Sequence, residues 1–246
     1  MASYVRRPKS SDHDLLLREL RSIGAEQKFR EHPLVANLRR LVPFEHFTFS
    51  GLDLDGFRVG SGAHLATNMP DRFLKGYLAG GFIKVDPLMR RSTETNPLAV
   101  WEAIPDEELG EPGVEQLRDL LRDCEVADRV GLSFWSDGRP YGVAVFTRAR
   151  GFGSAELATL ETFAGPLHDV FAGEALTHLN SRLGISSGEL RCLEWAARGL
   201  TSDEIAGETC YSPETVSTYL KSVTRKLGAS NRTQAVAEAL RRRLIR

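Results

Sequence analysis

The sequence predicts an α+β protein, with an N-terminal α/β/α sandwich on one largely antiparallel sheet and a C-terminal domain of four short helices. Three observations predict this. Helical and strand-like patterns interleave without the regular alternation of a doubly wound fold. Two β-rich segments flank Asp137-Gly-Arg-Pro140, a good hairpin turn, which indicates antiparallel pairing. The last 62 residues carry four separate helix-start signals.

The N-terminal elements follow from residue spacing and type. Apolar residues recur at near-helical spacing from Leu15 to Leu41 and predict a helical start. Pro43 introduces an aromatic strand over residues 44–50, and a turn at residues 53–56 leads into another strand. A helix is expected over residues 71–80, and strands over residues 98–102, 129–136 and 141–148. A last helix begins at Ser154, and Pro166 is expected to kink or split it.

The C-terminal elements carry explicit start and stop signals. Capping-box spacings at Ser186-Ser-Gly-Glu189 and Thr201-Ser-Asp-Glu204 open two helices, because the N-cap and N3 side chains satisfy each other's backbone donors. Ser212 with Pro213 opens the third helix, and Ser230-Asn231 the fourth. Glycines follow the first and third helices as stops, at positions 199 and 228. The sequence therefore predicts three parts: a domain over residues 1–172, a linker over 173–184 and a helical domain over 185–246.

Composition excludes several classes of protein. The mean hydropathy is −0.26, and no apolar run approaches the roughly 18 residues of a membrane span. The basic N-terminus has no apolar stretch behind it, so a secretory signal is not expected. Three widely separated cysteines form neither a disulfide framework nor a zinc-binding spacing. We therefore expect a cytoplasmic protein without membrane attachment.

The net charge of −1 conceals an asymmetry between the two parts. Residues 182–246 carry 11 basic and 7 acidic side chains, whereas residues 1–181 carry 21 and 26. A compact basic module on an acidic body is typical of binding to a polyanion. The alternative on charge alone is a solvated helix face with a basic tail.

The third C-terminal helix has the pattern of a helix that enters the major groove of DNA. One apolar stripe holds Val216, Tyr219, Leu220, Val223 and Leu227. The opposite face and its flanks carry small polar groups first and cations further along, which suits contacts to base edges and then to phosphates. Taken alone, such a stripe also fits an ordinary amphipathic helix with one solvated face.

Residues 185–206, Tyr211-Ser-Pro-Glu-Thr-Val216 and Lys226-Leu-Gly-Ala-Ser-Asn-Arg-Thr-Gln-Ala-Val236 closely resemble the LuxR-type helix-turn-helix. The resemblance implies binding to double-stranded DNA, with Ser217 and Lys221 nearest to base edges. Supporting or phosphate contacts are implied for Thr218, Ser222, Arg225 and Lys226. Two positions depart from the family: Gly188 replaces the usual Arg, and Tyr219 replaces a common His.

Residues 10–172 resemble the autoinducer-binding domain of quorum-sensing regulators. The resemblance rests on Asn68-Met-Pro-Asp-Arg-Phe-Leu-Lys-Gly-Tyr77, Val85-Asp-Pro87, Trp101, Arg129-Val-Gly131 and Phe146-Thr147. It implies a pocket for an N-acyl homoserine lactone between the sheet and the helices. Such a ligand needs one firm acceptor for its amide, a few donors, and apolar walls.

The resemblance assigns Asp86 as the acceptor for the ligand amide. It also implies that Tyr77 and Trp101 supply a wall and a hydrogen bond, and that Thr147 makes a polar contact near the start of the acyl chain. Two more positions in the same set, Met69 and Phe73, depart from the Tyr and Trp that the family usually has. Phe73 has no indole N–H, so the usual donor to the lactone carbonyl is missing. Several alternatives follow. Another donor or a water replaces the indole N–H, the ligand is a different one, or the response to a lactone is altered or lost.

No catalytic or metal-binding constellation emerges from the sequence. The six histidines, at positions 13, 32, 46, 64, 168 and 178, are dispersed and have no partnered nucleophile motif. We therefore expect neither an enzyme nor a cofactor apart from the small-molecule ligand.

Together the two resemblances imply a quorum-sensing transcriptional regulator. We expect a cytoplasmic homodimer that binds a two-fold symmetric operator, with RNA polymerase as a possible further partner. Ligand binding would stabilise the folded, dimer-competent state. The alternative is a solo regulator that is ligand-independent, or one that responds to a non-lactone ligand or a protein through its N-terminal domain.

Overall fold

A computed structural model describes residues 32–52, 64–126, 128–136 and 138–245 of the chain. The part of the expected helical start that precedes residue 32 lies outside the described residues. The expected turn at residues 53–56 also lies outside them. The described chain divides into two units, one that ends at Ala172 and one that continues from Gly173 to the C-terminus. We call the first the sensor domain, after the role that the sequence resemblance implies, and the second the C-terminal domain.

The sensor domain is built on a five-stranded sheet whose strands run in the order β2-β1-β5-β4-β3. All neighbouring strands pair antiparallel, as the sequence predicted for most of the sheet. The five strands are β1 (His46–Ser50), β2 (His64–Thr67), β3 (Leu98–Val100), β4 (Asp128–Ser136) and β5 (Arg139–Arg148).

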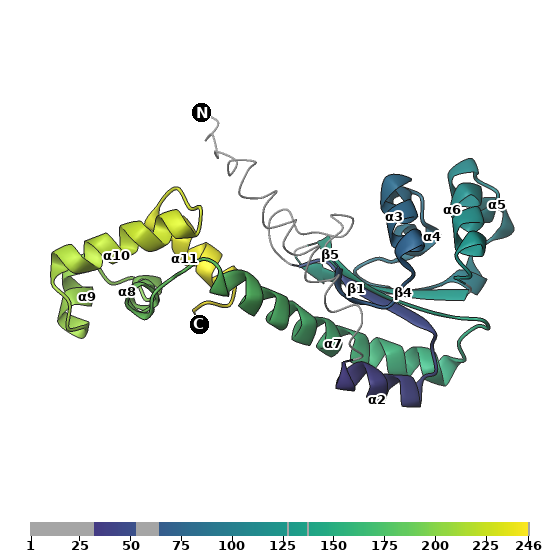
Figure 1. Cartoon of the computed structure of the whole chain (residues 1–246), viewed down its shortest axis with the longest axis horizontal. Coiled ribbons are helices and arrows are strands. Elements are labelled where there is room, and N and C mark those ends of the chain that lie inside the picture. Colours follow the sequence, from purple (N-terminus) through teal and green to yellow (C-terminus); the bar gives the residue numbers. More distant parts are fainter. Residues whose placement is uncertain (1–31, 53–63, 127, 137, 246) are drawn as a thin grey trace. The chain divides into compact units, whose positions relative to one another are not determined.

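Helices cover both faces of this sheet (Figure 1), so the predicted α/β/α sandwich is confirmed. The ring of Phe49 lies 5.1 Å from that of Phe171, and His168 Nε2 lies 3.0 Å from the carbonyl oxygen of Gly51. One face therefore packs on α2 (Pro33–Leu41) and the first part of α7 (Ser154–Ser181). The other face carries α3 (Asp71–Ala79), η1 (Phe82–Lys84), α4 (Pro87–Arg91), η2 (Trp101–Ala103), α5 (Asp106–Leu109) and α6 (Pro112–Asp123).

Alternation along the strands decides which side chains meet which helices. Phe47 and Phe49 of β1 pack with Phe146 of β5 in the aromatic core on the α7 side. Their neighbours in the sequence, Thr48 and Thr147, therefore lie on the face that carries α3 to α6. This second face is called the ligand face below.

The helix α7 runs without interruption from the sensor domain into the C-terminal domain. Pro166 lies inside it and does not split it, because Leu160, Ala164 and Leu167 on the same helix are buried and hold it on both sides. None of the described helices, α7 included, is long and apolar enough to cross a membrane.

The C-terminal domain contains the four predicted helices α8 (Ser187–Ala197), α9 (Ser202–Glu208), α10 (Pro213–Lys226) and α11 (Arg232–Arg241). Both predicted capping boxes are present, and Ser212 and Asn231 cap α10 and α11. The stops at Gly199 and Gly228 adopt positive φ angles of 90° and 66°. Buried side chains from all four helices form one core, among them Cys192, Leu193, Ile205, Val216, Leu220 and Ala235.

Candidate functional site

Asp86 is the most heavily bonded side chain on the ligand face. It caps α4 and is only 2% exposed. Its Oδ1 accepts hydrogen bonds from the Leu88 backbone N–H at 3.0 Å and from Arg129 Nη2 at 3.3 Å. Its Oδ2 accepts from Tyr77 Oη at 2.8 Å and from Arg129 Nη1 at 3.0 Å. The carboxylate is thus held by four donors from three elements.

Arg129 completes this cluster, and the sequence did not assign it a role. It is 3% exposed, and its guanidinium lies 4.3 Å from the centre of the Trp101 ring. A charged residue directly before the apolar stretch Val130-Gly-Leu132 of β4 was the available signal, because a buried charge requires a partner. Burial, followed by the Asp86 charge, raises the pKa of Tyr77 well above its usual value of 10. The Tyr77 phenol therefore remains a donor.

The two positions that depart from the family lie in a packed apolar cluster beside Asp86. Met69 is 3% and Phe73 is 5% exposed, and the Phe73 ring lies 5.6 Å from the ring of Tyr77. Tyr77 and Trp101 border the same cluster. Neither Met69 nor Phe73 offers a hydrogen-bond donor from its side chain.

Thr147, the last predicted ligand contact, is completely buried and stands opposite Arg129 in the sheet. Its hydroxyl has no hydrogen-bond partner. The structure thus gathers the predicted residues on the ligand face, around one apolar cluster and one buried ion pair.

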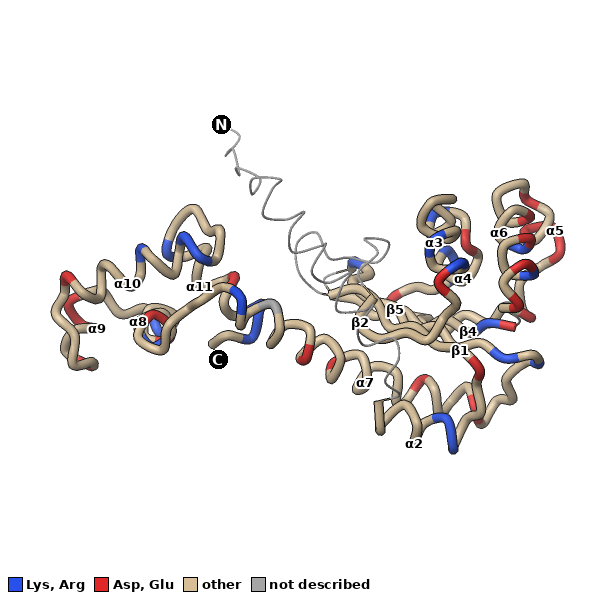
Figure 2. Tube along the Cα trace, viewed as in Figure 1, with Lys and Arg blue, Asp and Glu red and all other residues tan. Residues whose placement is uncertain are grey.

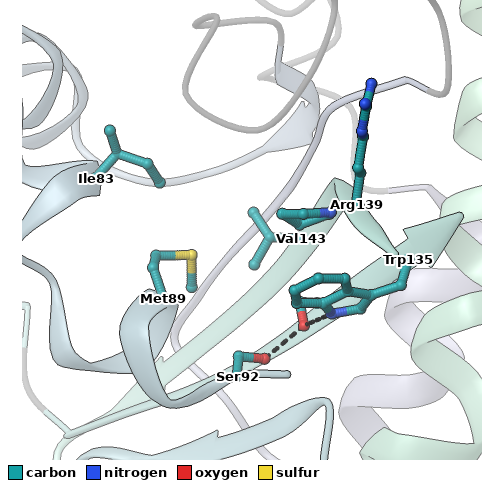
Figure 3. A pocket seen from close by; sticks show the side chains of 8 residues that line it. Ile83, Met89, Ser92, Trp135, Arg139 and Val143 are labelled. Atoms are coloured by element: carbon teal, nitrogen blue, oxygen red, sulfur yellow. Dashed lines mark hydrogen bonds between the residues drawn. The ribbon is translucent and has the colours of Figure 1, made fainter. Parts of the chain in front are cut away.

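A cavity of about 490 Å³ opens further along the same face (Figure 3). None of the six predicted ligand residues lines it. Its wall is mostly apolar and comprises Ile83, Met89, Ser92, Ser133, Trp135, Arg139, Pro140 and Val143. Ser133 and Val143 are cross-strand partners on β4 and β5, the strands that also hold Arg129 and Thr147. These residues come from four separate segments, which is why spacing in the sequence did not reveal them.

The polar groups of the cavity wall form a directed hydrogen-bond chain, drawn in part in Figure 3. Trp135 Nε1 donates to Ser133 Oγ at 2.6 Å, and the hydroxyls of Ser133 and Ser92 are 2.6 Å apart. Ser92 donates to the carbonyl oxygen of Pro97. Since an indole cannot accept, Ser133 must donate to Ser92. Every donor in the chain is therefore in use.

In the C-terminal domain, the predicted DNA-contacting residues lie along one side of α10. Thr218, Lys221 and Arg225 are exposed, and Ser217 and Ser222 are half-buried. Val216, Leu220 and Val223 are buried on the opposite side. Figure 2 shows basic residues along α10 and α11. Among the described residues, neither Lys221 nor Arg225 forms an ion pair, so both charges remain available.

Lys226 differs from Lys221 and Arg225 because its ammonium group forms an ion pair with Glu189. Its Nζ lies 2.7 Å and 2.9 Å from the two carboxylate oxygens of Glu189 and 2.7 Å from the carbonyl oxygen of Gly184. Burial alone would raise the pKa of Glu189, but hydrogen bonds from Lys226, Ser222 and Ser186 outweigh it and lower the pKa to about 2. Lys226 therefore ties α10 to α8.

Gly188 and Tyr219, the two departures from the DNA-binding family, contact each other. A Cβ atom at position 188 would lie 2.9 Å from Cε2 of Tyr219. The Tyr219 ring also packs edge-on against Tyr211, with 5.2 Å between the ring centres. The glycine thus makes room for the larger ring, so the two departures are one structural feature.

The described residues contain no group of three or more His, Cys, Asp or Glu side chains that could hold a metal ion.

Comparisons with known proteins cover both domains. The family model of the autoinducer binding domain matches residues 32–171, and that of the luxR family of bacterial regulatory proteins matches residues 184–239. The transcriptional activator PhzR of Pseudomonas fluorescens is 27% identical over 89% of this chain and 91% of its own length. The quorum-sensing-dependent regulator RpaR of Rhodopseudomonas palustris is 27% identical over 74% of this chain and 75% of its own length.

Solved structures agree on the fold. Escherichia coli SdiA, at 22% identity, has a TM-score of 0.51 and covers 96% of this chain and 98% of its own. SdiA in complex with octanoyl-rac-glycerol gives the same TM-score at 21% identity, over 98% and 97% of the two chains. With a matched sensor domain and a matched helix-turn-helix, the chain belongs to the LuxR family of quorum-sensing transcriptional regulators.

Proposed function

We propose that this regulator responds to an N-acyl homoserine lactone, which binds on the ligand face of the sensor domain and controls DNA binding. The buried cluster of Asp86, Arg129, Tyr77 and Trp101 supports this proposal, because it combines a carboxylate acceptor with aromatic walls on the sheet face that also carries a mostly apolar cavity. Asp86, Tyr77 and Trp101 would hold the amide and the head group, with Met69 and Phe73 as apolar wall and Thr147 at the start of the acyl chain. The acyl chain would extend toward the cavity.

The same proposal covers organisation and partners. The sensor domain would comprise residues 1–172, the linker 173–184 and the DNA-binding domain 185–246. The protein would act in the cytoplasm as a homodimer on a two-fold symmetric operator, since a dimer of helix-turn-helix domains reads two half-sites. Contact with RNA polymerase would follow from binding beside a promoter.

The test is thermal unfolding of the full-length protein with N-octanoyl homoserine lactone or octanoyl-glycerol as ligand. A ligand present at a hundred times its Kd should stabilise the protein by about 2.7 kcal/mol. Stabilisation by the lactone supports the proposal. Stabilisation by octanoyl-glycerol alone indicates a non-lactone ligand, and no stabilisation by either indicates a ligand-independent regulator.

We propose different DNA contacts for the two exposed cations of α10, Lys221 and Arg225. Lys221→Ala should cost about 1–3 kcal/mol at an operator and relax specificity, because we propose that Lys221 reads a base. Arg225→Ala should weaken specific and nonspecific DNA binding alike and flatten the salt dependence, as expected for a phosphate contact. Binding assays over a range of salt concentrations check both. Equal effects of the two substitutions on all DNA sequences would contradict these roles.

A further inference from the structure

Three buried polar atoms without a hydrogen-bond partner lie in one row across the sensor sheet. They are His46 Nδ1 on β1, Thr147 Oγ1 on β5 and Arg129 Nε on β4. In the register of the sheet His46 stands opposite Thr147, and Thr147 stands opposite Arg129. Residues directly opposite each other on antiparallel strands have Cβ atoms only ~4.5–5.5 Å apart. The row therefore brings three unsatisfied groups together.

The row faces the ligand side of the sheet. Phe47 and Phe146, which alternate with His46 and Thr147, point into the aromatic core on the other side. Val145, two residues from Thr147, borders the apolar cluster of Met69 and Phe73. Arg129 is bonded to Asp86 on this same face. The unsatisfied atoms thus lie beside the proposed head-group site.

The chemistry of the row is that of hydrogen-bond donors. Both Nη atoms of Arg129 are engaged by Asp86, and its remaining Nε–H group can only donate. The Thr147 hydroxyl and the His46 imidazole can donate as well. Buried polar groups are almost always paired in native proteins, so three unpaired groups in one row indicate a partner that carries an acceptor.

We propose that this row binds the carbonyl oxygen of the ligand's acyl group, and that it replaces the donors that Met69 and Phe73 lack. The inference rests on the proposed small-molecule function and adds His46 and Arg129 to the binding residues. It applies to any acyl ligand, whether an acyl amide or an acyl ester.

The position of the cavity agrees with this assignment. Ser133 and Val143 in the cavity wall lie four residues along their strands from Arg129 and Thr147, which is ~13 Å at ~3.3 Å per residue. Between them stands Gly131, where a Cβ atom would be 3.4 Å from the methyl group of Met89. Met89 is flexible enough to move aside for an alkyl chain. The cavity wall has no free donor in its serine–tryptophan chain, so it suits the alkyl tail rather than the carbonyl.

The decisive experiment compares two probes that differ only in the carbonyl: 1-octanoyl-glycerol, an ester, and 1-octyl-glycerol, the matching ether. Binding of each to the full-length protein is measured by calorimetry, together with thermal unfolding of the free protein. The wild type should bind the ester about tenfold more tightly, which is the contribution of roughly one net hydrogen bond. Thr147→Val and His46→Phe, which retain shape and remove the polar atoms, should each reduce that preference severalfold.

Thr48→Val is the matched control, because Thr48 lies on the same strand face but its hydroxyl is within 3.4 Å of His64 Nδ1. It should leave the ester preference unchanged. Thr147→Val should also leave the melting temperature of the free protein unchanged or higher, because it removes an unsatisfied buried group. A merely structural role for Thr147 would instead lower that temperature.

Three outcomes would overturn the inference. Equal binding of ester and ether by the wild type means that the row does not bind the carbonyl. An undiminished preference in both Thr147→Val and His46→Phe places the carbonyl elsewhere. In either case the proposed function is decided separately, by the thermal shift with N-octanoyl homoserine lactone. If neither probe nor N-octanoyl homoserine lactone binds, the proposed ligand class falls together with the inference.

Discussion

The two domains treat their buried polar groups in opposite ways. Within the described residues 184–245 of the C-terminal domain, every buried side-chain nitrogen or oxygen has a hydrogen-bond partner. In the sensor domain, His46, Thr147 and Arg129 each leave one such atom unsatisfied, in neighbouring strands. Asn180 Oδ1, in the part of α7 that belongs to the C-terminal domain, is also unsatisfied. Residues 184–245 thus satisfy their own buried polar side chains, whereas the sensor sheet lacks an acceptor for this row of three.

The range of the interactions explains this difference. In the C-terminal domain the caps join residues three apart, as in Ser186 with Glu189 and Thr201 with Glu204. The ion pair of Lys226 with Glu189 spans a longer stretch, of 37 residues. In the sensor domain the central ion pair joins Asp86 to Arg129, 43 residues away. A cap forms together with its helix, whereas a partner on a distant strand or on a ligand is supplied only by the tertiary fold or by binding. Until that partner arrives, the buried polar group carries the cost of an unsatisfied hydrogen bond. Sensing is thus located where the fold depends on long-range contacts.

The largest effect is expected from Asp86→Asn. This change leaves the buried Arg129 charge without its counter-ion, so the sensor domain should lose about 3–5 kcal/mol of stability. Stabilisation by a lactone should fall by a further 1.5–3 kcal/mol if Asp86 also accepts the ligand amide. Chemical unfolding with and without ligand separates the two losses. The control Tyr77→Phe removes only one hydrogen bond and should cost much less.

If Asp86→Asn unfolded at the wild-type denaturant concentration, the ion pair would not organise the sensor domain. If it kept the full ligand-induced stabilisation, the assignment of Asp86 as the amide acceptor would be wrong.

The next effect is expected at Glu189, whose substitution would leave Lys226 without its carboxylate partner in the C-terminal domain. The pKa of Glu189 is about 2 in the folded protein and 4.5 for the free side chain, so its ionisation contributes stability above pH 4.5 that is lost as the pH falls toward 2. The shift corresponds to about 3 kcal/mol. Glu189→Gln should therefore destabilise the domain at pH 7 and remove much of this acid sensitivity, which unfolding curves at pH 7 and pH 3 would measure. Equal acid sensitivity in the variant and the wild type would argue against it.

A smaller effect is expected where Gly188 meets Tyr219. Gly188→Ala should cost about 1–3 kcal/mol, because the new Cβ would lie 2.9 Å from the Tyr219 ring. The cost should shrink when Tyr219 is first replaced by His, so a double-mutant cycle should show coupling. Gly207→Ala is the control, since its Cβ would meet nothing within 4 Å. Additive effects of the two changes would show that the two departures from the family are independent.

The same contrast in interaction range explains what the sequence could predict. The C-terminal helices, caps and stops are local signals, and all four helices were predicted. In the sensor domain the sheet and the sandwich were predicted from alternation and turns. The partner of Asp86 and the cavity wall were not, because Arg129 meets Asp86, and Ser92 meets Ser133, only in the tertiary fold. Lys226 was grouped with the DNA contacts because spacing on a helix does not show that Glu189 lies opposite.

The hydrogen bond from Trp135 to Ser133 also has an optical consequence. The chain has three tryptophans, and each reports on a different place: Trp135 on the cavity wall, Trp101 beneath Arg129 and Trp195 beneath Arg198 in the C-terminal domain. Because the Trp135 indole N–H is already bonded inside the protein, an alkyl chain that enters the cavity changes the polarity around the ring and leaves that bond in place. Its fluorescence should therefore shift to shorter wavelength as the cavity fills. Trp135 is thus an intrinsic fluorescent probe of ligand binding in the cavity, and Trp101 is a second probe beside Arg129.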